Sequence, residues 1–222
     1  MISIIVPVYK EEAAFKNFLA QKTKLKGIYE LLFVITKEDI KLKQKYPNER
    51  FIISKKGRSF QMNNGVKQST GEILLFLHCD SIFEDNILNE IEKSLEISPF
   101  GCLKLHFDSN HPLMKICGLM SRLRVKLRGI AFGDQGIFLT RKLFEEIGGF
   151  EEIPIMEDYK LSIDIKNQGI RVNQCDSKII TRSVRFEREG IIRTMYKMQK
   201  YQSMYRRGVN PETIAQLYKD IR

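Results

Sequence analysis

The chain has 222 residues, of which 43% are hydrophobic and 29% charged, a composition typical of a soluble globular domain and not of a low-complexity chain. Its formal net charge of +10 favours an anionic partner such as nucleotide phosphates, lipid head groups or nucleic acid. Four widely separated cysteines without a C-x-x-C pair argue against a zinc site or a disulfide framework. The apolar run at residues 2–6 is too short for a signal peptide, and no stretch reaches the roughly 18 apolar residues that span a bilayer. We therefore expect a cytoplasmic protein.

Strands and helices alternate through the first hundred residues. Residues 2–8 form a continuous β-branched apolar run of the kind buried in a parallel sheet, with Pro7 at its end, where a missing N–H is tolerated. The pattern predicts strands at 2–8, 29–35, 51–54 and 72–77, and helices at 11–24, within 57–69 and at 86–97. This alternation predicts an α/β fold with a doubly wound, mostly parallel sheet flanked by helices.

The second half continues this pattern and ends in an amphipathic helical tail. It predicts strands at 102–108, 136–140, 171–175 and 178–181, and helices at 113–127, 141–147, 157–168 and 191–205. Gly148 and Gly149 end one of these helices, and Asn210 caps a last short helix that has Pro211 at its first position. Because the sequence shows no internal repeat and no linker, we expect a single domain over 1–222.

Polar residues follow two of the buried strands. Tyr9 and Glu11 come after Pro7, in a position to stack on a base and to bind a ribose hydroxyl, or alternatively to form a plain strand-to-helix turn. Asp80 follows the strand at 72–77, where an unpaired buried carboxylate would be costly. It either binds a ligand at the carboxyl edge of the sheet or caps the next turn.

Five motifs occur in order along the chain. They read I-I-V-P-V-Y-K-E-E from residue 4, G-R-S-F-Q-M-N-N-G at 57–65, L-L-F-L-H-C-D-S at 74–81, G-D-Q-G-I-F at 133–138 and I-P-I-M-E-D at 153–158. Together they resemble the family 2 glycosyltransferases of GT-A fold, and above all a small single-domain bacterial subgroup. The resemblance covers nearly the whole chain. It implies a nucleotide-binding half at about 1–100, an acceptor half at about 101–185 and a helical tail at about 186–222.

The resemblance also implies a divalent metal. In that fold a D-x-D motif holds Mn²⁺ or Mg²⁺ on the diphosphate of the donor, and here Asp80 takes the place of the second acid while His78 replaces the first. An imidazole in place of a carboxylate suits Mn²⁺ somewhat better than Mg²⁺. One departure concerns the nucleobase of the donor. The family has an aspartate directly after the second strand that contacts the uracil or ribose. Here that aspartate is missing and Asp39 is displaced, so the identity of the nucleobase stays open.

The remaining site residues are inferred from the same motifs. Asp158 matches the general base of the family, and Glu157 precedes it; both also favour the start of a helix. The resemblance assigns donor binding to Pro7, Tyr9, Glu11, Arg58, Gln61, Asn63 and Asp80, the acceptor side to Gly133, Asp134 and Gln135, and closure over the diphosphate to Arg182 and Arg185. Arg182 and Arg185 fit a solvated surface equally well.

Two helices admit two interpretations. The helix at 113–127 has an apolar stripe and a basic face, and the tail helix is rich in Met and Tyr. The stripe comprises Ile116, Leu119, Met120, Leu123 and Leu127, and the basic face comprises Lys115, Arg122, Arg124, Lys126 and Arg128. Both helices either pack on the sheet, which we favour, or contact anionic lipid at the inner face of the membrane.

The function implied by the resemblance is metal-assisted transfer of a sugar from a nucleotide-sugar donor to an unknown acceptor hydroxyl, with inversion at the anomeric carbon. An alternative is a non-catalytic nucleotide- or lipid-binding module on the same fold, which the histidine at position 78 and the displaced Asp39 favour. Nucleic acid is not an expected partner, because net charge alone points to it and no reader motif is present.

Overall fold

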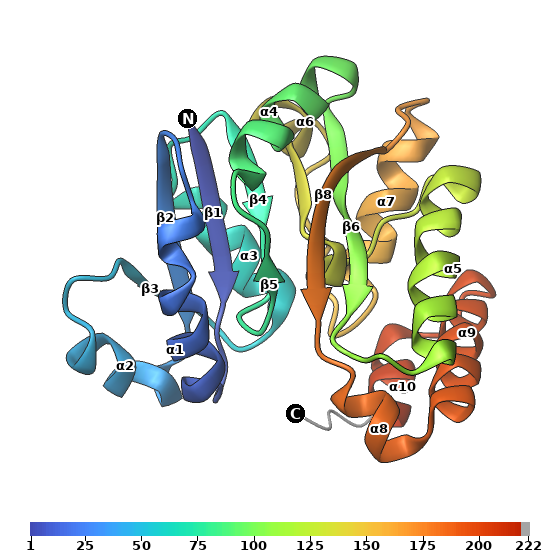
Figure 1. The fold of residues 1–222 in the computed structure, drawn as a ribbon. Helices are drawn as coiled ribbons and strands as arrows, with labels where there is room; N and C mark the ends of the chain where they lie inside the picture. The colour runs from blue at the N-terminus through green and yellow to red at the C-terminus, as the bar shows by residue number, and fades with distance from the viewer. Residues whose placement is uncertain (219–222) are drawn as a thin grey trace.

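The computed structural model describes residues 1–218, which form one eight-stranded sheet with helices on both faces (Figure 1). The strands are β1 (Ile2–Pro7), β2 (Tyr29–Ile35), β3 (Phe51–Ile53), β4 (Ile73–Phe76), β5 (Ile82–Phe83), β6 (Phe100–Phe107), β7 (Ile137–Thr140) and β8 (Asn173–Thr181). The helices are α1 (Glu12–Ala20), α2 (Ile40–Lys45), α3 (Arg58–Lys67), α4 (Ile87–Ile97), α5 (Pro112–Arg128), α6 (Arg141–Glu146), α7 (Glu157–Asn167), α8 (Val184–Glu189), α9 (Ile191–Arg206) and α10 (Pro211–Leu217). Short 3-10 turns are η1 (Lys22–Lys24), η2 (Lys37–Asp39) and η3 (Gly133–Gln135).

The sheet has the order β3-β2-β1-β4-β7-β6-β8-β5. β1 pairs in parallel with β2 and β4, and β2 with β3, whereas β7 is antiparallel to both of its neighbours, β4 and β6. Because β6 pairs in parallel with β8, most strands of the described residues run in one direction. This confirms the expected α/β fold with a mostly parallel sheet flanked by helices.

Both faces of the sheet are covered, which explains why its central strands are apolar on both sides. Helices α1 and α4 pack on one face through Phe15, Phe18 and Ile91, and α3 and α7 pack on the other through Met62 and Ile165. The carboxyl ends of β1, β2 and β4 therefore meet at one edge, between two helical layers. In an open α/β sheet this edge is where ligands bind.

The second half differs from the prediction in two strands. The expected strands at 171–175 and 178–181 are one strand, β8, whose pairing with β6 shifts register between Cys102 and Lys104. Where the register shifts, the side chains of β8 no longer alternate regularly between the two faces of the sheet, so the sequence pattern indicates two short strands instead of one. The edge strand β5 was not predicted, because two residues are too few to show a period; it is held by antiparallel pairing of Ile82 with Ile180.

The apolar stripe predicted on α5 does not pack on the sheet. The face that does so carries Met114, Cys117, Gly118, Ser121 and Val125, all buried. Small residues there let α5 approach β6 closely, since a Cβ at Gly118 would lie 3.5 Å from the carbonyl oxygen of Leu105. The expectation that the stripe is a packing surface is therefore wrong, and the stripe faces outward.

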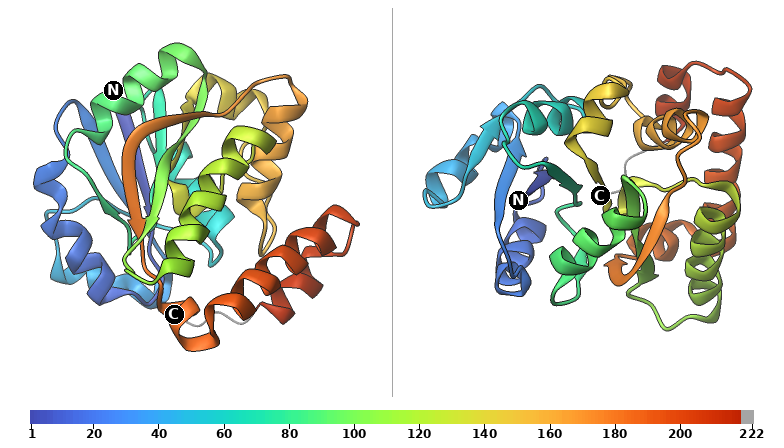
Figure 2. Two further views of the ribbon diagram at one scale, coloured as in Figure 1. Left: turned by 45° about the vertical axis from the view of Figure 1, so that its right-hand side comes forward. Right: turned by 90° about the horizontal axis from the view of Figure 1, so that it is seen from above.

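The tail forms a separate group of helices. In Figure 1 and Figure 2, α8 to α10 (orange to red) lie beyond the end of the sheet toward which β6 and β8 run. Their core contains Tyr201 and Ile214, which cluster with Ile130, Met156 and Tyr159. Asn210 Oδ1 accepts a hydrogen bond from Glu212 N at 2.8 Å, which confirms the predicted cap of the last helix.

Residues 1–218 contain no helix long and apolar enough to cross a membrane. The four cysteines, all of which lie in this part of the chain, are buried free thiols.

Candidate active site

The loop after β1 places Tyr9 between two lysines. The ammonium of Lys56 lies 4.5 Å and that of Lys10 lies 5.3 Å from the centre of the Tyr9 ring. A hydrogen bond with Lys56 lowers the pKa of the Tyr9 phenol. A partly exposed ring with cations on it offers a surface on which a base could stack, and it also attracts phosphate.

Asp39 lies closer to this loop than its place in the sequence suggests. The 3-10 turn η2 turns the chain back at the end of β2, and Asp39 is buried there. Its Oδ1 accepts from the amide of Lys10 at 2.9 Å and its Oδ2 from Thr36 Oγ1 at 3.0 Å. A cavity of about 280 Å³ opens beside it, lined by Lys10, Glu12, Glu38, Asp39, Lys41, Leu42 and Lys45. A carboxylate is thus present at the carboxyl ends of β1 and β2, although the sequence does not place it directly after the strand.

Gln61 and Asn63 hold the backbone around this edge. Both hydrogens of the Gln61 amide are donated to carbonyl oxygens, that of Val8 at 3.0 Å and that of Val34 at 2.6 Å. Asn63 donates to the carbonyl of Phe150 at 2.8 Å and accepts from its amide at 3.0 Å. The structure therefore gives both amides partners inside the protein; their role in donor binding stays a prediction.

Asp80 lies in the loop after β4, which turns sharply because Ser81 N donates to His78 O at 3.1 Å. The Oδ1 atom of Asp80 is buried and has no hydrogen-bond partner within residues 1–218. A buried carboxylate oxygen without a donor is costly. A cation or a ligand hydroxyl would relieve this cost, and the role of Asp80 in binding stays a prediction.

His78 and Asp158 approach each other across Gly133. A Cβ at Gly133 would lie 3.0 Å from Nε2 of His78 and 3.2 Å from Oδ2 of Asp158, which leaves no room for a side chain. The amide of Gly133 donates to Asp158 Oδ2 at 2.7 Å, so the turn η3 is fastened to the start of α7. The three predicted motifs around positions 78, 133 and 158 therefore meet at one place.

Glu157 is buried beside Arg58. The Arg58 Nη1 and Glu157 Oε1 atoms are 3.7 Å apart, and Glu157 is only 3% exposed. Arg58 opens α3 and Glu157 opens α7, so this pair joins two helix N-termini at the site. Arg58 keeps about a third of its side chain exposed and can still donate to an anion.

Arg124 was not predicted as a site residue, because helical periodicity places it among the basic residues of α5. The structure shows instead that it reaches inward: Nη2 donates to Gln135 Oε1 at 2.6 Å and Nε donates to Ile130 O at 3.3 Å. Its guanidinium also lies 4.1 Å from the centre of the Phe132 ring. Arg124 thereby fixes η3, and burial lowers the pKa of its guanidinium while Asp134 opposes this effect.

Burial perturbs the ionisation of the Asp134 carboxyl. Burial raises the pKa of its carboxyl to about 6, Arg124 opposes the rise, and the charges of Asp158 and Asp80 add to it. Its Oδ1 is buried and has no hydrogen-bond partner in the described part of the chain. Asp80, Asp134 and Asp158 thus lie within electrostatic reach of one another, with Arg58 and Arg124 as the cations that offset them.

The described residues contain no group of three or more His, Cys, Asp or Glu side chains arranged to hold a metal by themselves. Asp80, with its buried Oδ1, can serve as one oxygen ligand of a hard cation. A single carboxylate leaves most positions around such an ion to bound phosphate oxygens and water, as is usual for Mg²⁺ in proteins.

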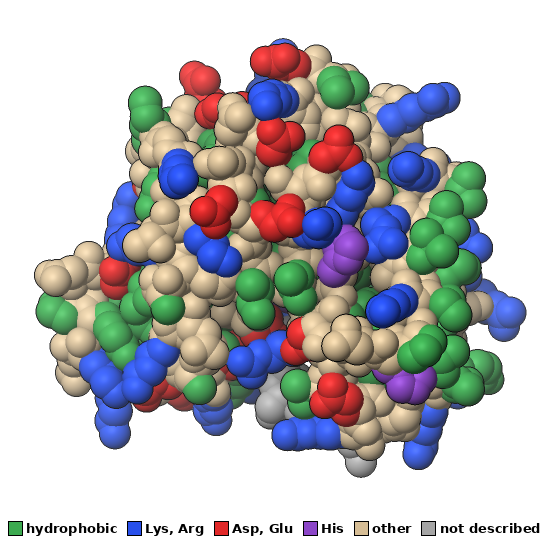
Figure 3. All heavy atoms as spheres, viewed as in Figure 1, with side chains coloured by type: hydrophobic (Ala, Val, Ile, Leu, Met, Phe, Trp, Pro, Cys, Tyr) green, Lys and Arg blue, Asp and Glu red, His purple; other side chains and the backbone are tan. Residues whose placement is uncertain are grey.

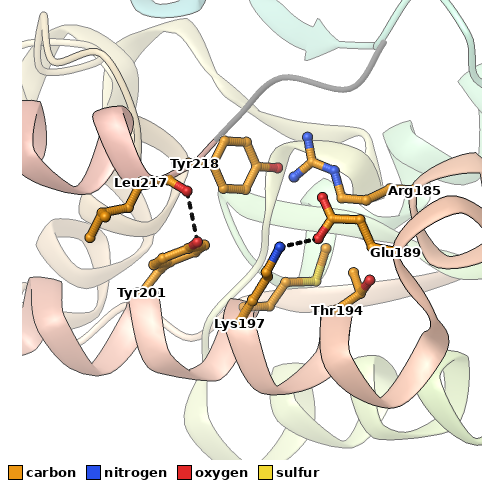
Figure 4. A pocket seen from close by; sticks show the side chains of 8 residues that line it. Arg185, Glu189, Thr194, Lys197, Tyr201, Leu217 and Tyr218 are labelled. Atoms are coloured by element: carbon orange, nitrogen blue, oxygen red, sulfur yellow. Dashed lines mark hydrogen bonds and ion pairs between the residues drawn. The ribbon is translucent and has the colours of Figure 1, made fainter.

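Arg185 lines a pocket formed by the tail helices (Figure 4). Its guanidinium stacks 4.0 Å from the centre of the Tyr218 ring, and Lys197 pairs with Glu189 at the side of this pocket of about 240 Å³. Tyr201 OH donates to Leu217 O at 2.9 Å and ties α9 to α10. Arg182 is exposed at the end of β8. Closure of either arginine over a diphosphate stays a prediction.

Comparison with family models and with curated protein sequences gives no match. Solved structures do match. S. aureus TarS residues 1–349 superposes with a TM-score of 0.60 at 18% identity over 82% of this chain and 60% of TarS 1–349, and a complex of the same fragment with UDP-GlcNAc gives a TM-score of 0.60. The mannosyltransferase PcManGT from Pyrobaculum calidifontis was solved with GDP-Man and Mn²⁺. It superposes with a TM-score of 0.64 at 15% identity, over 99% of this chain and 65% of the PcManGT chain.

The chain therefore spans less than two thirds of the length of these solved proteins. At such low identity the similarity concerns the fold. This chain has the GT-A-like α/β fold that is found in nucleotide-sugar glycosyltransferases.

Proposed function

We propose that this protein is a glycosyltransferase that moves a sugar from a nucleotide-activated donor to an acceptor hydroxyl. The observation that carries the proposal is the meeting of Asp80, Asp134 and Asp158 with His78 and Arg58 at the carboxyl edge of the sheet. That edge is the ligand site of an open α/β sheet. Solved structures with this fold hold UDP-GlcNAc or GDP-Man, which supports a nucleotide sugar as the ligand class.

The donor would lie along the carboxyl ends of β1, β2 and β4. Tyr9 offers its ring to the base, and Asp39 can accept from base or ribose because a carboxylate oxygen has room for more than one hydrogen bond. Arg58 and the lysines around Tyr9 lie where they would offset phosphate charge. These contacts define the donor half of the proposal.

Asp80 would hold a divalent metal together with the diphosphate, with His78 beside it. Such an ion, when bound, offsets the charge that develops on the leaving diphosphate. PcManGT, which shares the fold, was solved with Mn²⁺, and this supports the choice of metal. The test is calorimetric titration of UDP and GDP with and without Mn²⁺, in which Asp80→Asn should abolish the metal-dependent part of the affinity and His78→Ala should weaken it less.

Asp158 is the proposed general base. It is the second residue of α7, and its carboxylate accepts from the amide of Gly133, so its orientation is fixed before an acceptor binds. It would take the proton of the acceptor hydroxyl as that oxygen attacks the anomeric carbon and the nucleoside diphosphate leaves, which inverts the configuration in one displacement. Glu157 is held by Arg58 and would position the helix end.

The experiment compares Asp158→Asn with the wild type in donor hydrolysis or transfer, with nucleotide affinity measured in parallel. We expect turnover to fall by roughly 10²-fold or more at nearly unchanged nucleotide affinity, because a positioned base contributes about that much. Wild-type turnover in Asp158→Asn would move the base to Asp134 or Glu157. Nucleotide binding without any turnover of the wild-type protein would favour the non-catalytic module.

A further inference from the structure

Helix α5 exposes a continuous apolar stripe on the side away from the sheet. Its side chains follow the spacing of one helix face, and they cover the part of the surface that α5 occupies in Figure 3 (green spheres along the right-hand edge). The exposed fractions are 49% for Ile116, 48% for Leu119, 55% for Met120, 37% for Leu123 and 81% for Leu127. Monomeric soluble proteins seldom expose large apolar side chains in one contiguous row without a binding role.

Cations flank this stripe, and no acid lies on the same helix. Residues 112–128 contain five Lys or Arg and no Asp or Glu, and residues 191–206 of the neighbouring α9 contain four Lys or Arg and no Asp or Glu. Lys115, Lys126 and Arg128 are exposed. On adjoining elements Asp176 pairs with Lys104, and Glu189 pairs with Lys197 and offsets that one lysine of α9. Asp108 accepts from the neutral hydroxyl of Ser183 and keeps its charge, so the cations of the two helices outnumber the unpaired acids named here.

Helix α9 packs against the inner side of α5, and it too has exposed apolar side chains and a net positive charge. Met195 and Met198 join Met114 and Cys117 in one cluster, so the two helices form one unit. Ile192 and Tyr196 on α9 are 72% and 68% exposed. The unit therefore combines exposed large apolar side chains with a one-sided positive charge.

We propose that α5, with α9 beside it, docks on a membrane surface rich in anionic phospholipid. An amphipathic helix with Leu, Ile and Met on one face and Lys or Arg at its flanks lies in the interfacial plane, where apolar chains enter the acyl boundary and cations meet head groups. A second copy of the chain is a poor occupant, because self-association would oppose two faces of the same positive charge. Membrane docking goes beyond the proposed function and does not depend on it; only the consequence for the acceptor rests on that function.

In the docked orientation the single helix α5 would separate the bilayer from the G-D-Q turn of the proposed active site. Arg124 projects from the inner face of α5 to Gln135 in η3, so the stripe and the G-D-Q turn lie on opposite sides of one helix. An acceptor held in or on the membrane would then reach the site over a short distance. A water-soluble acceptor would gain nothing from this arrangement, which makes vesicle dependence of turnover informative about the acceptor.

The test is co-sedimentation of the full chain with vesicles of phosphatidylcholine alone and with 30% phosphatidylglycerol. We expect binding to the mixed vesicles only. The double variant Leu119→Gln/Met120→Gln should lower the partition coefficient roughly thirtyfold, because two half-buried apolar side chains lose their insertion. Gln is a good helix former, so α5 should persist. The variant Lys115→Gln/Lys126→Gln should lose roughly fivefold for each lysine and become less sensitive to salt.

The control is Ile97→Gln, at the end of α4, which removes an apolar side chain outside the unit that is more exposed (77%) than Leu119 or Met120 and should bind like the wild type. Absence of binding to the mixed vesicles, or equal loss in the control, would overturn the inference. So would a concentration-dependent dimer that Leu119→Gln/Met120→Gln dissociates, because the stripe would then be a contact between copies. Nucleotide affinity in solution should be unchanged in all these variants, which separates this test from that of the proposed function.

Discussion

The buried carboxyl of Asp134 should make the stability of the protein depend on pH, and Asp134→Asn should remove that dependence. Burial raises the pKa of Asp134 from the ordinary 3.8 to about 6, so the folded protein holds this proton more tightly than the unfolded chain. The resulting stabilisation is fully present below about pH 4 and is lost as the pH rises through about 6. Asparagine has nearly the same shape and carries no titrating group, so it should not show this loss.

The magnitude follows from the size of the shift. A shift of about 2 pKa units corresponds to about 3 kcal/mol. Asp134 keeps some contact with solvent although its Oδ1 is buried, so screening reduces the effect, and we expect about 1–3 kcal/mol. For a domain of this size that amounts to a difference in Tm of roughly 2–10 °C.

The assay is urea unfolding of both proteins at several pH values from 4.5 to 7.5, with a chelator present to exclude bound metal. The free energy of unfolding of Asp134→Asn minus that of the wild type should grow toward high pH, at equal m-values. A difference that stays constant with pH would refute the reasoning. A difference that shrinks as the pH rises would show that Arg124 stabilises the ionised carboxylate more than burial opposes it.

Three further variants test other parts of the site. Arg124→Gln should lower the free energy of unfolding and raise the pKa of Asp134 above about 6, because the cation that opposes the effect of burial is gone. Urea unfolding of this variant over the same pH range measures both changes. Gln61→Met should cost about 1–3 kcal/mol in urea unfolding, since it removes the Gln61 donor of the Val8 carbonyl and leaves the Val34 carbonyl with the backbone amide of Val8 alone, and a cost below about 0.5 kcal/mol would contradict the hydrogen bonds described. Gly65→Ala should destabilise by about 1–3 kcal/mol in thermal or urea unfolding, because its Cβ would lie 2.5 Å from Cγ2 of Ile5, and unchanged stability would show that α3 can move away from β1.

The sequence sufficed for the features that depend on local pattern. The apolar run of β1 and the paired glycines after α6 mark their elements directly, and the order of strands and helices predicts the layered sheet. Asp80, Asp134 and Asp158 were named as site residues because of their motifs, and the structure brings them within electrostatic reach of one another. Their roles in binding and catalysis remain predictions.

The features that depend on tertiary packing could not be read from pattern. Periodicity shows that α5 is amphipathic, but it does not show which face of the helix packs on the sheet. The packed face includes the small residues Cys117, Gly118 and Ser121, whereas the large apolar residues of the stripe are exposed. Arg124 has the same helical spacing as its solvated neighbours, and only the position of Gln135 reveals that it turns inward. Asp39 returns to the strand end through a turn too short to give a periodic signal.

The two-residue strand β5 has a consequence for the order in which the protein assembles. It holds the segment just after Asp80, and its pairing partners, Ile179 and Ile180, come about 100 residues later in the chain. At a synthesis rate of about 5–20 residues per second, that partner leaves the ribosome roughly 5–20 seconds after the Asp80 loop. The Asp80 loop can therefore reach its final arrangement only when the molecule is nearly complete, so nascent chains that end before β8 should lack the ability to bind donor even if β1 to β4 have already folded.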